Sequence, residues 1–351
     1  IALLSLALCG GTTSCNYLDV VPPEQASLPD ATKDPESTLG FLFSCYGGIR
    51  NPFDYQTVEA GADEYVLPPL WNTGSQKITW DLNLPTNIAD GWSWGSNYRF
   101  IGQCLLFLQQ LPHARGVTDE QKRAWAAEAN FLLAYYHMVT LVAYGPCPIT
   151  DTYIDQATPE SEYNGRMHFD YVKDWICQKF DEVCEDGQLP ATRTGDEWGR
   201  ATSVMAKALK ARLLVYAASP LFNGSFPYKD WENTNFETPG YGKELISLKY
   251  DRKKWEVAKA ACQEAITAAE AAGHKLFSLE DAQSLYQQAG LPLPFVPFKS
   301  AEGGTADKDK EFMERVQLMR YVVTTRYKEG NRETIWGLAN QGTMIIGSLP
   351  H

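Results

Sequence analysis

Apolar residues recur at helical spacing in several separate stretches of this 351-residue chain. In the stretch Ala124–Leu141, the residues Ala127, Phe131, Tyr135 and Val139 fall four apart, so that they share one helix face. Alanine lets a neighbouring helix approach closely, and the aromatic rings fill the space between the two helices. This pattern is typical of stacked helical hairpins rather than of a catalytic loop.

The same kind of spacing continues along much of the chain. Thr118, followed by Gln121, predicts a capping box at the start of the helix that contains this stretch. Residues 51–91, 225–250 and 290–310 are rich in Pro, Gly and aromatic residues and show no sustained period, so we expect long loops there. Further helices are expected over residues 35–46, 92–111, 167–186, 201–218, 251–272 and 279–289, and a short strand over residues 333–338.

These elements together predict a mainly α-helical fold. Paired helices with alanine and aromatic contact positions indicate tetratricopeptide-like hairpins that form a scaffold, although no clean 34-residue repeat is visible. We expect long loops and a few short strands to lie across this scaffold.

Several side chains are expected in the core. Trp125, Trp175 and Trp255 lie at helical spacing among apolar neighbours, and His137 is expected to be buried and hydrogen-bonded. Cys177 and Cys184 lie seven apart, about two helical turns, which is too far for a disulfide. We expect free thiols here and at the other cysteines that follow residue 15, namely Cys45, Cys104, Cys147 and Cys262.

Charge narrows the class of ligand. The formal net charge of −12 argues against nucleic acid and against an anionic membrane surface, because both require clustered Lys and Arg. Residues 16–111 contain 4 basic and 11 acidic residues together with four tryptophans. An acidic, aromatic surface suits neutral polyhydroxylated ligands better than anions.

The amino-terminal residues indicate export. Residues 1–14 contain a short apolar run and resemble the remnant of a signal peptide. The small residues Thr13 and Ser14 precede Cys15, which predicts lipidation of Cys15; ordinary secretion is the alternative. Residues 15–33 would then form a lipidated tether, and no later stretch is long and apolar enough to cross a membrane.

Three ordered motifs resemble those of the SusD/RagB family of outer-membrane nutrient-binding lipoproteins. The first is Ala-Glu-Ala-Asn-Phe-Leu-Leu-Ala-Tyr-Tyr at 127–136, followed by Tyr-Gly-Pro-Cys-Pro-Ile at 144–149. The second is Gly-Arg-Ala-Thr at 199–202 with Ser-Pro-Leu-Phe-Asn-Gly at 219–224. The third is Ser-Cys-Asn-Tyr-Leu-Asp at 14–19.

The resemblance implies one SusD-like domain over residues 34–351, with an amino-terminal part at 34–224 and a loop-rich part at 225–351. Family members continue into a further carboxy-terminal region, so we expect that this chain is truncated or shortened. The implied function is binding of glycan or oligosaccharide at the cell surface, with delivery to a SusC-type TonB-dependent transporter. The outer membrane would hold the protein through the lipid anchor.

The resemblance also implies a ligand site. Trp-x-Trp-x-x-Asn at 92–97 is similar to the aromatic arc and asparagine with which starch-binding members hold glucans. Aromatic platforms with a few polar groups suit a sugar's apolar faces and hydroxyl edges. Alternatively, Trp94 and Tyr98 are inward anchors, which pack into the core at the start of a helix, and the tryptophans in the preceding loop only hold that loop in place. The candidate ligand-binding residues are Trp71, Lys77, Trp80, Trp92, Trp94 and Asn97.

We expect no catalytic residue, no metal and no cofactor. The histidines show no metal-ligand spacing, and GxSxG, P-loop and GxGxxG motifs do not occur. Adjacent acidic residues rarely place two carboxyl groups across a glycosidic bond. Three alternatives remain open: a peptide-binding RagB-type lipoprotein, a structural partner of the transporter that binds no ligand, and a hydrolase.

Overall fold

The computed structural model describes most of the helical body of the protein. The described residues are 28–49, 94–155, 157–288 and 290 and, near the carboxyl end, 312, 314–316, 318, 319, 322, 325, 327 and 330–337. Expectations for residues 50–93, and for Cys15 and its surroundings, lie outside this part of the chain.

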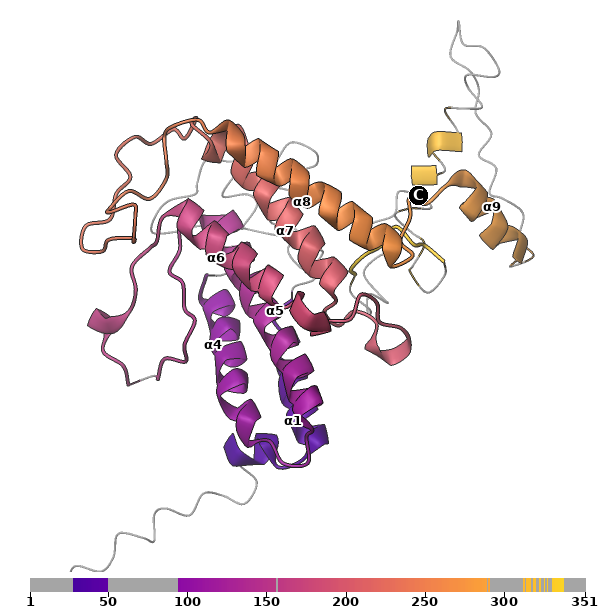
Figure 1. Ribbon diagram of the computed structural model, residues 1–351, viewed down its shortest axis with the longest axis horizontal. Coiled ribbons are helices and arrows are strands. Elements are labelled where there is room, and N and C mark those ends of the chain that lie inside the picture. Colours follow the sequence, from indigo (N-terminus) through magenta and orange to yellow (C-terminus); the bar gives the residue numbers. More distant parts are fainter. Residues whose placement is uncertain are drawn as a thin grey trace, which may run out of the picture.

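Seven α-helices make up about half of the described residues (Figure 1). Their bounds are α1 Pro35–Tyr46, α4 Trp94–Gln110, α5 Asp119–Tyr144, α6 Phe169–Glu182, α7 Ser203–Ala218, α8 Arg252–Ala271 and α9 Leu279–Gln288. Short 3₁₀ turns lie between them: η1 Leu28–Thr32, η3 Leu111–His113, η4 Glu160–Glu162, η5 Glu185–Gly187, η6 Gly195–Glu197 and η7 Pro220–Phe222. The predicted helices are therefore confirmed, with ends within a few residues of those expected.

The helices stack in chain order. α4 packs on α5, α5 on α6, α6 on α7 and α7 on α8, while α1 lies against both α4 and α5 (Figure 1). The mainly α-helical scaffold of stacked hairpins is confirmed. Within the described ranges, extended pairing is limited to the isolated antiparallel bridges Glu232–Glu244 and Thr238–Gly242.

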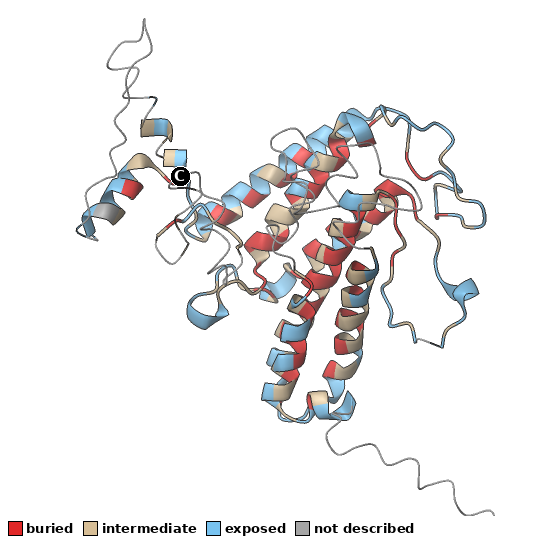
Figure 2. Ribbon diagram, turned by 180° about the vertical axis from the view of Figure 1, so that it is seen from behind, coloured by how far each residue is buried: buried red, intermediate tan, exposed pale blue. Residues whose placement is uncertain are grey.

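Helix α5 is the centre of the core, as Figure 2 shows by the buried residues along it. Phe131, Leu132 and Ala134 are completely buried, since neighbouring helices cover more than one side of α5. The predicted capping box starts this helix: the Thr118 hydroxyl accepts a bond from the Gln121 amide, and the Gln121 side chain accepts one from the Thr118 amide. Gly145, with φ of 69°, ends it.

A buried ion cluster joins the two internal sequence motifs. The Glu128 side chain on α5 is fully buried, and its carboxylate accepts two bonds from Arg200, at 2.5 and 3.1 Å. Arg193 donates a third at 2.9 Å, and the Tyr46 hydroxyl of α1 donates a fourth at 2.6 Å. Burial and the adjacent Glu128 carboxylate raise the pKa of Tyr46 well above its ordinary value. Glu128 of the first motif and Arg200 of the second are thus joined in one buried ion pair that ties α5 to the segment before α7.

Other expectations about the core are partly confirmed. Trp125 is buried and Trp175 is half-buried, with its ring 4.7 Å from that of His137. Trp255 is 42% exposed, so the prediction that it lies in the core is wrong. α8 contacts α7 through a stripe of alanines, and Trp255 falls outside that stripe.

The predicted strand at residues 333–338 is also wrong over its described part, because residues 331–337 form turns and bends. Trp336 in this segment donates its indole N–H to the Gly199 carbonyl at 3.0 Å, and its ring lies 5.6 Å from Phe131. The segment therefore covers the core as an irregular chain.

The six cysteines named as thiols are free, as expected. Burial raises the pKa of the Cys147 thiol to about 12, so this thiol is protonated and unreactive at neutral pH. In the described part of the chain, none of the helices has the length and apolar character needed to cross a bilayer.

Candidate functional site

Trp94 stands at the first residue of α4, where the described chain resumes. Its backbone N–H donates to the Tyr144 hydroxyl at 3.0 Å, and its ring centroid lies 5.3 Å from that of Tyr144 and 5.1 Å from that of Tyr98. The Arg166 guanidinium lies over the same indole at 4.7 Å. The half-buried Trp94 side chain is therefore held by three neighbours and packs inward.

Tyr98 and Asn97 follow Trp94 on α4. The Tyr98 hydroxyl donates to the Pro148 carbonyl at 2.7 Å, which ties α4 to the chain that leaves α5. Asn97 is 3% exposed, and no described residue accepts a hydrogen bond from its side-chain Nδ2. Because a buried amide without a hydrogen bond costs about 1–3 kcal/mol, this Nδ2 requires an acceptor from outside the described residues.

The geometry agrees with the alternative that Trp94 and Tyr98 are inward anchors, and a direct ligand role for Trp94 and Asn97 stays a prediction. The other candidate residues lie outside the described part of the chain: Trp71, Lys77, Trp80 and Trp92. The predicted lipidation residue Cys15 lies outside it as well.

The turn after α5 brings together side chains from distant segments. Arg166 donates to the carbonyls of Pro146, at 2.5 Å, and Tyr144, at 3.4 Å, so the stacked guanidinium also holds the turn. Trp231, from the loop before α8, packs on Gly145: a Cβ placed there would lie 3.4 Å from the indole ring. Trp94 and Trp231 thus flank one turn, although 137 residues separate them in the sequence.

An open hollow of about 710 Å³ lies beside this turn. Its described lining consists of consecutive residues of the loop between α7 and α8: Phe226, Pro227, Tyr228, Lys229, Asp230 and Trp231. The sequence predicts an aromatic-rich loop here, but these residues are not among the candidate ligand-binding residues. The Phe-Pro-Tyr-x-x-Trp run in a region without helical period was the available signal.

One pair of polar residues tests the hydrolase alternative. Ser247 Oγ and His168 Nε2 are 3.1 Å apart, which is the separation of a nucleophile and its base. However, His168 Nδ1 accepts the backbone N–H of Asp170 at 3.0 Å, so Nε2 carries the proton and donates to Ser247. Burial also lowers the pKa of His168 to about 4. This histidine is a neutral helix cap and is not arranged to remove a proton from Ser247.

His137 is another buried histidine with both ring nitrogens bonded. Nε2 accepts the Thr150 N–H at 3.1 Å, and Nδ1 donates to the Leu133 carbonyl at 2.8 Å. Burial lowers its pKa to about 4, as the sequence-based expectation of a buried, bonded histidine implies. Among the residues that the structure describes, no group of His, Cys, Asp and Glu is placed to hold a metal ion.

Solved structures similar to this chain define its class. BT4246 is 52% identical and has a TM-score of 0.78; the match covers 88% of this chain and 51% of that protein. A SusD-like protein from Bacteroides fragilis NCTC 9343 is 18% identical with a TM-score of 0.54, covering 79% of this chain and 48% of that one. The protein is therefore a helix-rich protein with the SusD-like fold.

A SusD superfamily protein from Bacteroides vulgatus ATCC 8482 shares the fold at 11% identity and a TM-score of 0.50, covering 72% of this chain and 51% of that protein. The chain has the SusD-like fold, in agreement with the family that its ordered motifs resemble. It spans about half the length of the solved structures that it matches. No protein-family model matches the sequence, and neither does any of the curated proteins compared with it.

Proposed function

We propose that this chain belongs to a lipid-anchored protein of the outer membrane that binds an oligosaccharide and delivers it to a SusC-type TonB-dependent transporter. The mechanism is binding without chemistry. Aromatic rings stack on the sugar, polar side chains bond its hydroxyls, and the helical scaffold holds both in place.

The observation that carries this proposal is the cluster of aromatic side chains around the turn after α5, with an exposed tyrosine beside it. Trp94, Tyr144 and Trp231 surround the turn after α5, and the open hollow beside it exposes Tyr228. Aromatic rings with a few polar groups form the kind of surface that recognises sugars. The SusD-like fold agrees with the resemblance of the sequence motifs to those of nutrient-binding lipoproteins.

Trp92, Trp94 and Asn97, together with Trp71, Lys77 and Trp80, are proposed as ligand-binding or ligand-positioning residues. Trp94 would act by orienting the segment that precedes it, because its own ring is already engaged by Arg166, Tyr144 and Tyr98. Asn97, whose Nδ2 has no hydrogen-bond partner among the described residues, would donate a hydrogen bond to the ligand.

Isothermal titration of the purified chain with neutral oligosaccharides tests the site. Trp92→Ala is expected to weaken binding about tenfold, since one lost ring contact of about 1.4 kcal/mol corresponds to that factor. Trp94→Ala is expected to weaken binding as well, because it removes the ring that positions the residues before it. Trp255→Ala is the matched control, because Trp255 is an exposed tryptophan on α8. Undiminished affinity in both site variants would remove these residues from the binding site. A chain that binds peptide pools but no oligosaccharide would instead favour the RagB-type function.

The anchor and the partner need separate experiments. Metabolic labelling with a fatty acid should label the wild-type protein and not Cys15→Ser. A tagged protein extracted from outer membranes should co-purify with a TonB-dependent transporter. A labelled Cys15→Ser variant or the absence of a transporter would contradict the corresponding part of the proposal. If deletion of the tryptophan-containing loop at residues 71–92 leaves transport intact, the protein is a structural partner instead.

A further inference from the structure

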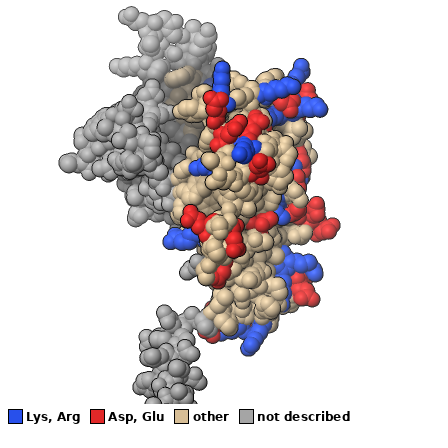
Figure 3. All heavy atoms as spheres, turned by 90° about the vertical axis from the view of Figure 1, so that its left-hand side faces the viewer, with Lys and Arg blue, Asp and Glu red and all other residues tan. Residues whose placement is uncertain are grey.

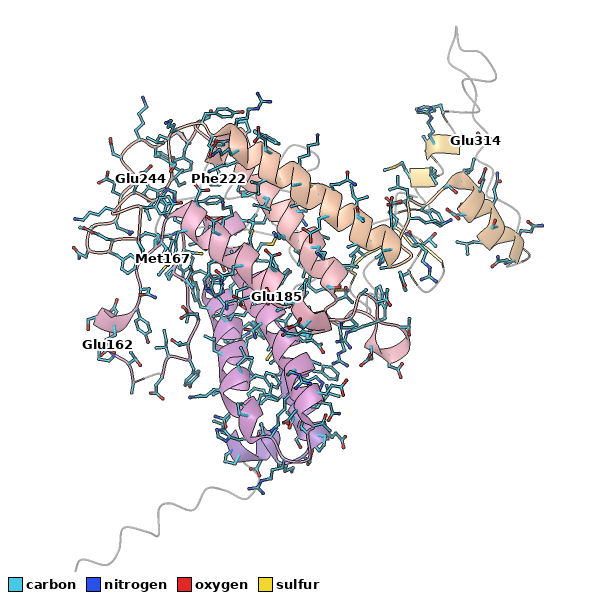
Figure 4. The ribbon with its side chains drawn as sticks, in the orientation of Figure 1. Glu162, Met167, Glu185, Phe222, Glu244 and Glu314 are labelled. Carbon is cyan, nitrogen blue, oxygen red and sulfur yellow. The ribbon has the colours of Figure 1, made fainter. Side chains whose placement is uncertain are left out.

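The two ends of the loop between α7 and α8 are held together by the Ser-Pro-Leu-Phe-Asn-Gly motif at 219–224. Asn223 Oδ1 accepts the backbone N–H of Asp251 at 2.7 Å, and Asn223 Nδ2 donates to the Asp251 carbonyl at 3.0 Å. Phe222 stacks on Phe169 of α6 with ring centroids 4.2 Å apart and an angle of 7°. Figure 4 shows Phe222 at the root of the loop and Glu244 farther out on it. The loop therefore leaves the scaffold from a fixed base.

The segment that lines the hollow is held at its far end as well. Asn233 Nδ2 donates to the Arg166 carbonyl at 2.6 Å, and its backbone N–H donates to the Lys243 carbonyl at 2.9 Å. Arg166 is the residue whose guanidinium stacks on Trp94. The hollow is consequently a preformed feature, fixed to the turn after α5, and a ligand would not need to order it.

Three aromatic rings form its wall. Phe226 and Trp231 stack with centroids 5.4 Å apart at an angle of 11°, and Trp231 is backed by Gly145. Tyr228 meets Phe226 edge to face, with centroids 5.8 Å apart at 64°. Tyr228 is nevertheless 69% exposed. One edge of this ring is thus positioned by the protein while much of its surface faces solvent.

The polar groups of the hollow have opposite charges. Lys229 and Asp230 are exposed, and neither forms an ion pair with another described residue. Figure 3 shows that acidic and basic side chains are interspersed on this side of the molecule. Such a mixture attracts neither anions nor cations strongly, but it offers a hydrogen-bond donor and an acceptor to a neutral ligand rich in hydroxyl groups.

We propose that residues 226–231 form a saccharide-contact surface of their own. Tyr228 stacks on the apolar face of a pyranose ring, while the Lys229 ammonium donates to a sugar hydroxyl and the Asp230 carboxylate accepts from one. This inference extends the proposed function, on which it rests for the class of ligand. It places a contact surface outside the candidate residues 71–97.

Native electrophoresis in gels that contain a soluble neutral polysaccharide tests the surface. Separate gels would contain a glucan, a mannan, a xylan and a galactan, and the purified wild-type chain is expected to be retarded in at least one. Tyr228→Ala should weaken the apparent affinity about tenfold, and Tyr228→Phe should retain most of it because stacking needs only the ring. Tyr163→Ala is the control, since Tyr163 is 45% exposed and does not line the hollow. Thermal melts verify that each variant is folded.

The outcomes separate this inference from the proposed function. If the wild type is retarded and Tyr228→Ala is retarded equally, the surface at 226–231 does not bind saccharide, while the proposed function stands. If the wild type is retarded by no polysaccharide, the glycan function and the inference both fail. Loss of retardation in Tyr163→Ala to the same extent as in Tyr228→Ala would also overturn the inference, because the effect would not be specific to the hollow.

Discussion

Replacing Glu128 by glutamine is the sharpest test of how the two sequence motifs stabilise this fold. The carboxylate accepts four bonds of 2.5 to 3.1 Å, three from Arg193 and Arg200 and one from Tyr46. The glutamine keeps the shape of the side chain but removes its charge and one acceptor. The two arginines, which are largely buried, then lose the anion that compensates them.

Removal of one partner from a buried ion cluster costs about 3–5 kcal/mol, because the remaining charge is left without compensation. Glu197 also bonds both arginines, and its side chain is 55% exposed. We therefore expect a loss at the lower end, about 3 kcal/mol. At roughly 2 °C per kcal/mol, the melting temperature would fall by about 6 °C.

Thermal unfolding followed by circular dichroism measures this effect, and urea unfolding gives the free energy. Glu197→Gln is the matched control, since it removes a carboxylate from the same arginines at an exposed position and should cost less than about 1 kcal/mol. The reasoning is refuted if Glu128→Gln melts within 1 °C of the wild type, or if the control is destabilised as much. The first result would mean that the cluster contributes little to holding α1, α5 and the segment before α7 together. The second would mean that the burial of Glu128 does not set the size of its contribution.

Two further predictions follow from burial. A Cβ at Gly48 would lie 2.4 Å from the Phe100 ring, so Gly48→Ala should lower the free energy of unfolding by about 1–3 kcal/mol. Gly102 lies on α4 with open space around it, so Gly102→Ala should raise the free energy of unfolding by up to about 1 kcal/mol. Urea unfolding that ranks the two variants the other way would contradict this prediction. His137 and His168 have a pKa of about 4 instead of the ordinary 6.5 because they are buried. As the pH drops, the unfolded chain binds a proton at each of these imidazoles before the folded chain does. The free energy of unfolding is therefore unaffected by these histidines above about pH 6.5. Between about pH 6.5 and 4 it falls by roughly 1.4 kcal/mol per pH unit for each histidine. Imidazole NMR signals that titrate near pH 6.5 would disprove it.

Helical elements could be predicted from the sequence because their signals are local. Apolar spacing along α5 placed Ala127 and Phe131 on one helix face, and both are buried. The capping box at Thr118 and Gln121 depends on residues three apart and formed as expected. In these cases the residues that determine the structure are neighbours in the chain.

The failed predictions share a cause. Periodicity indicates which residues share a helix face, but it does not say how much of that face another element covers. Trp255 falls outside the alanine stripe through which α8 contacts α7, and so it is partly exposed. At residues 331–337, the segment has strand-like composition but lies on the core without a partner strand among the described residues.

For the candidate site, the sequence identified Trp94 as a candidate residue and residues 144–149 as part of a family motif, but it did not indicate that the two lie in contact. The stacking of Arg166 on Trp94 and the packing of Trp231 on Gly145 join segments that are far apart in the chain. The hollow at residues 226–231 has no local pattern beyond a run of aromatic residues. Its preformed shape depends on bonds from Asn223 and Asn233 to other segments.

By itself, the sequence determined the helices, their caps, the resemblance to a family and the acidic, aromatic character of the chain, because each depends on composition or on residues a few positions apart. Only the tertiary structure decided that Glu128 and Arg200 meet in one buried cluster and that Trp94 and Trp231 flank one turn. Those contacts depend on how the helices stack, and burial and distance between remote residues exist only once that stacking has formed.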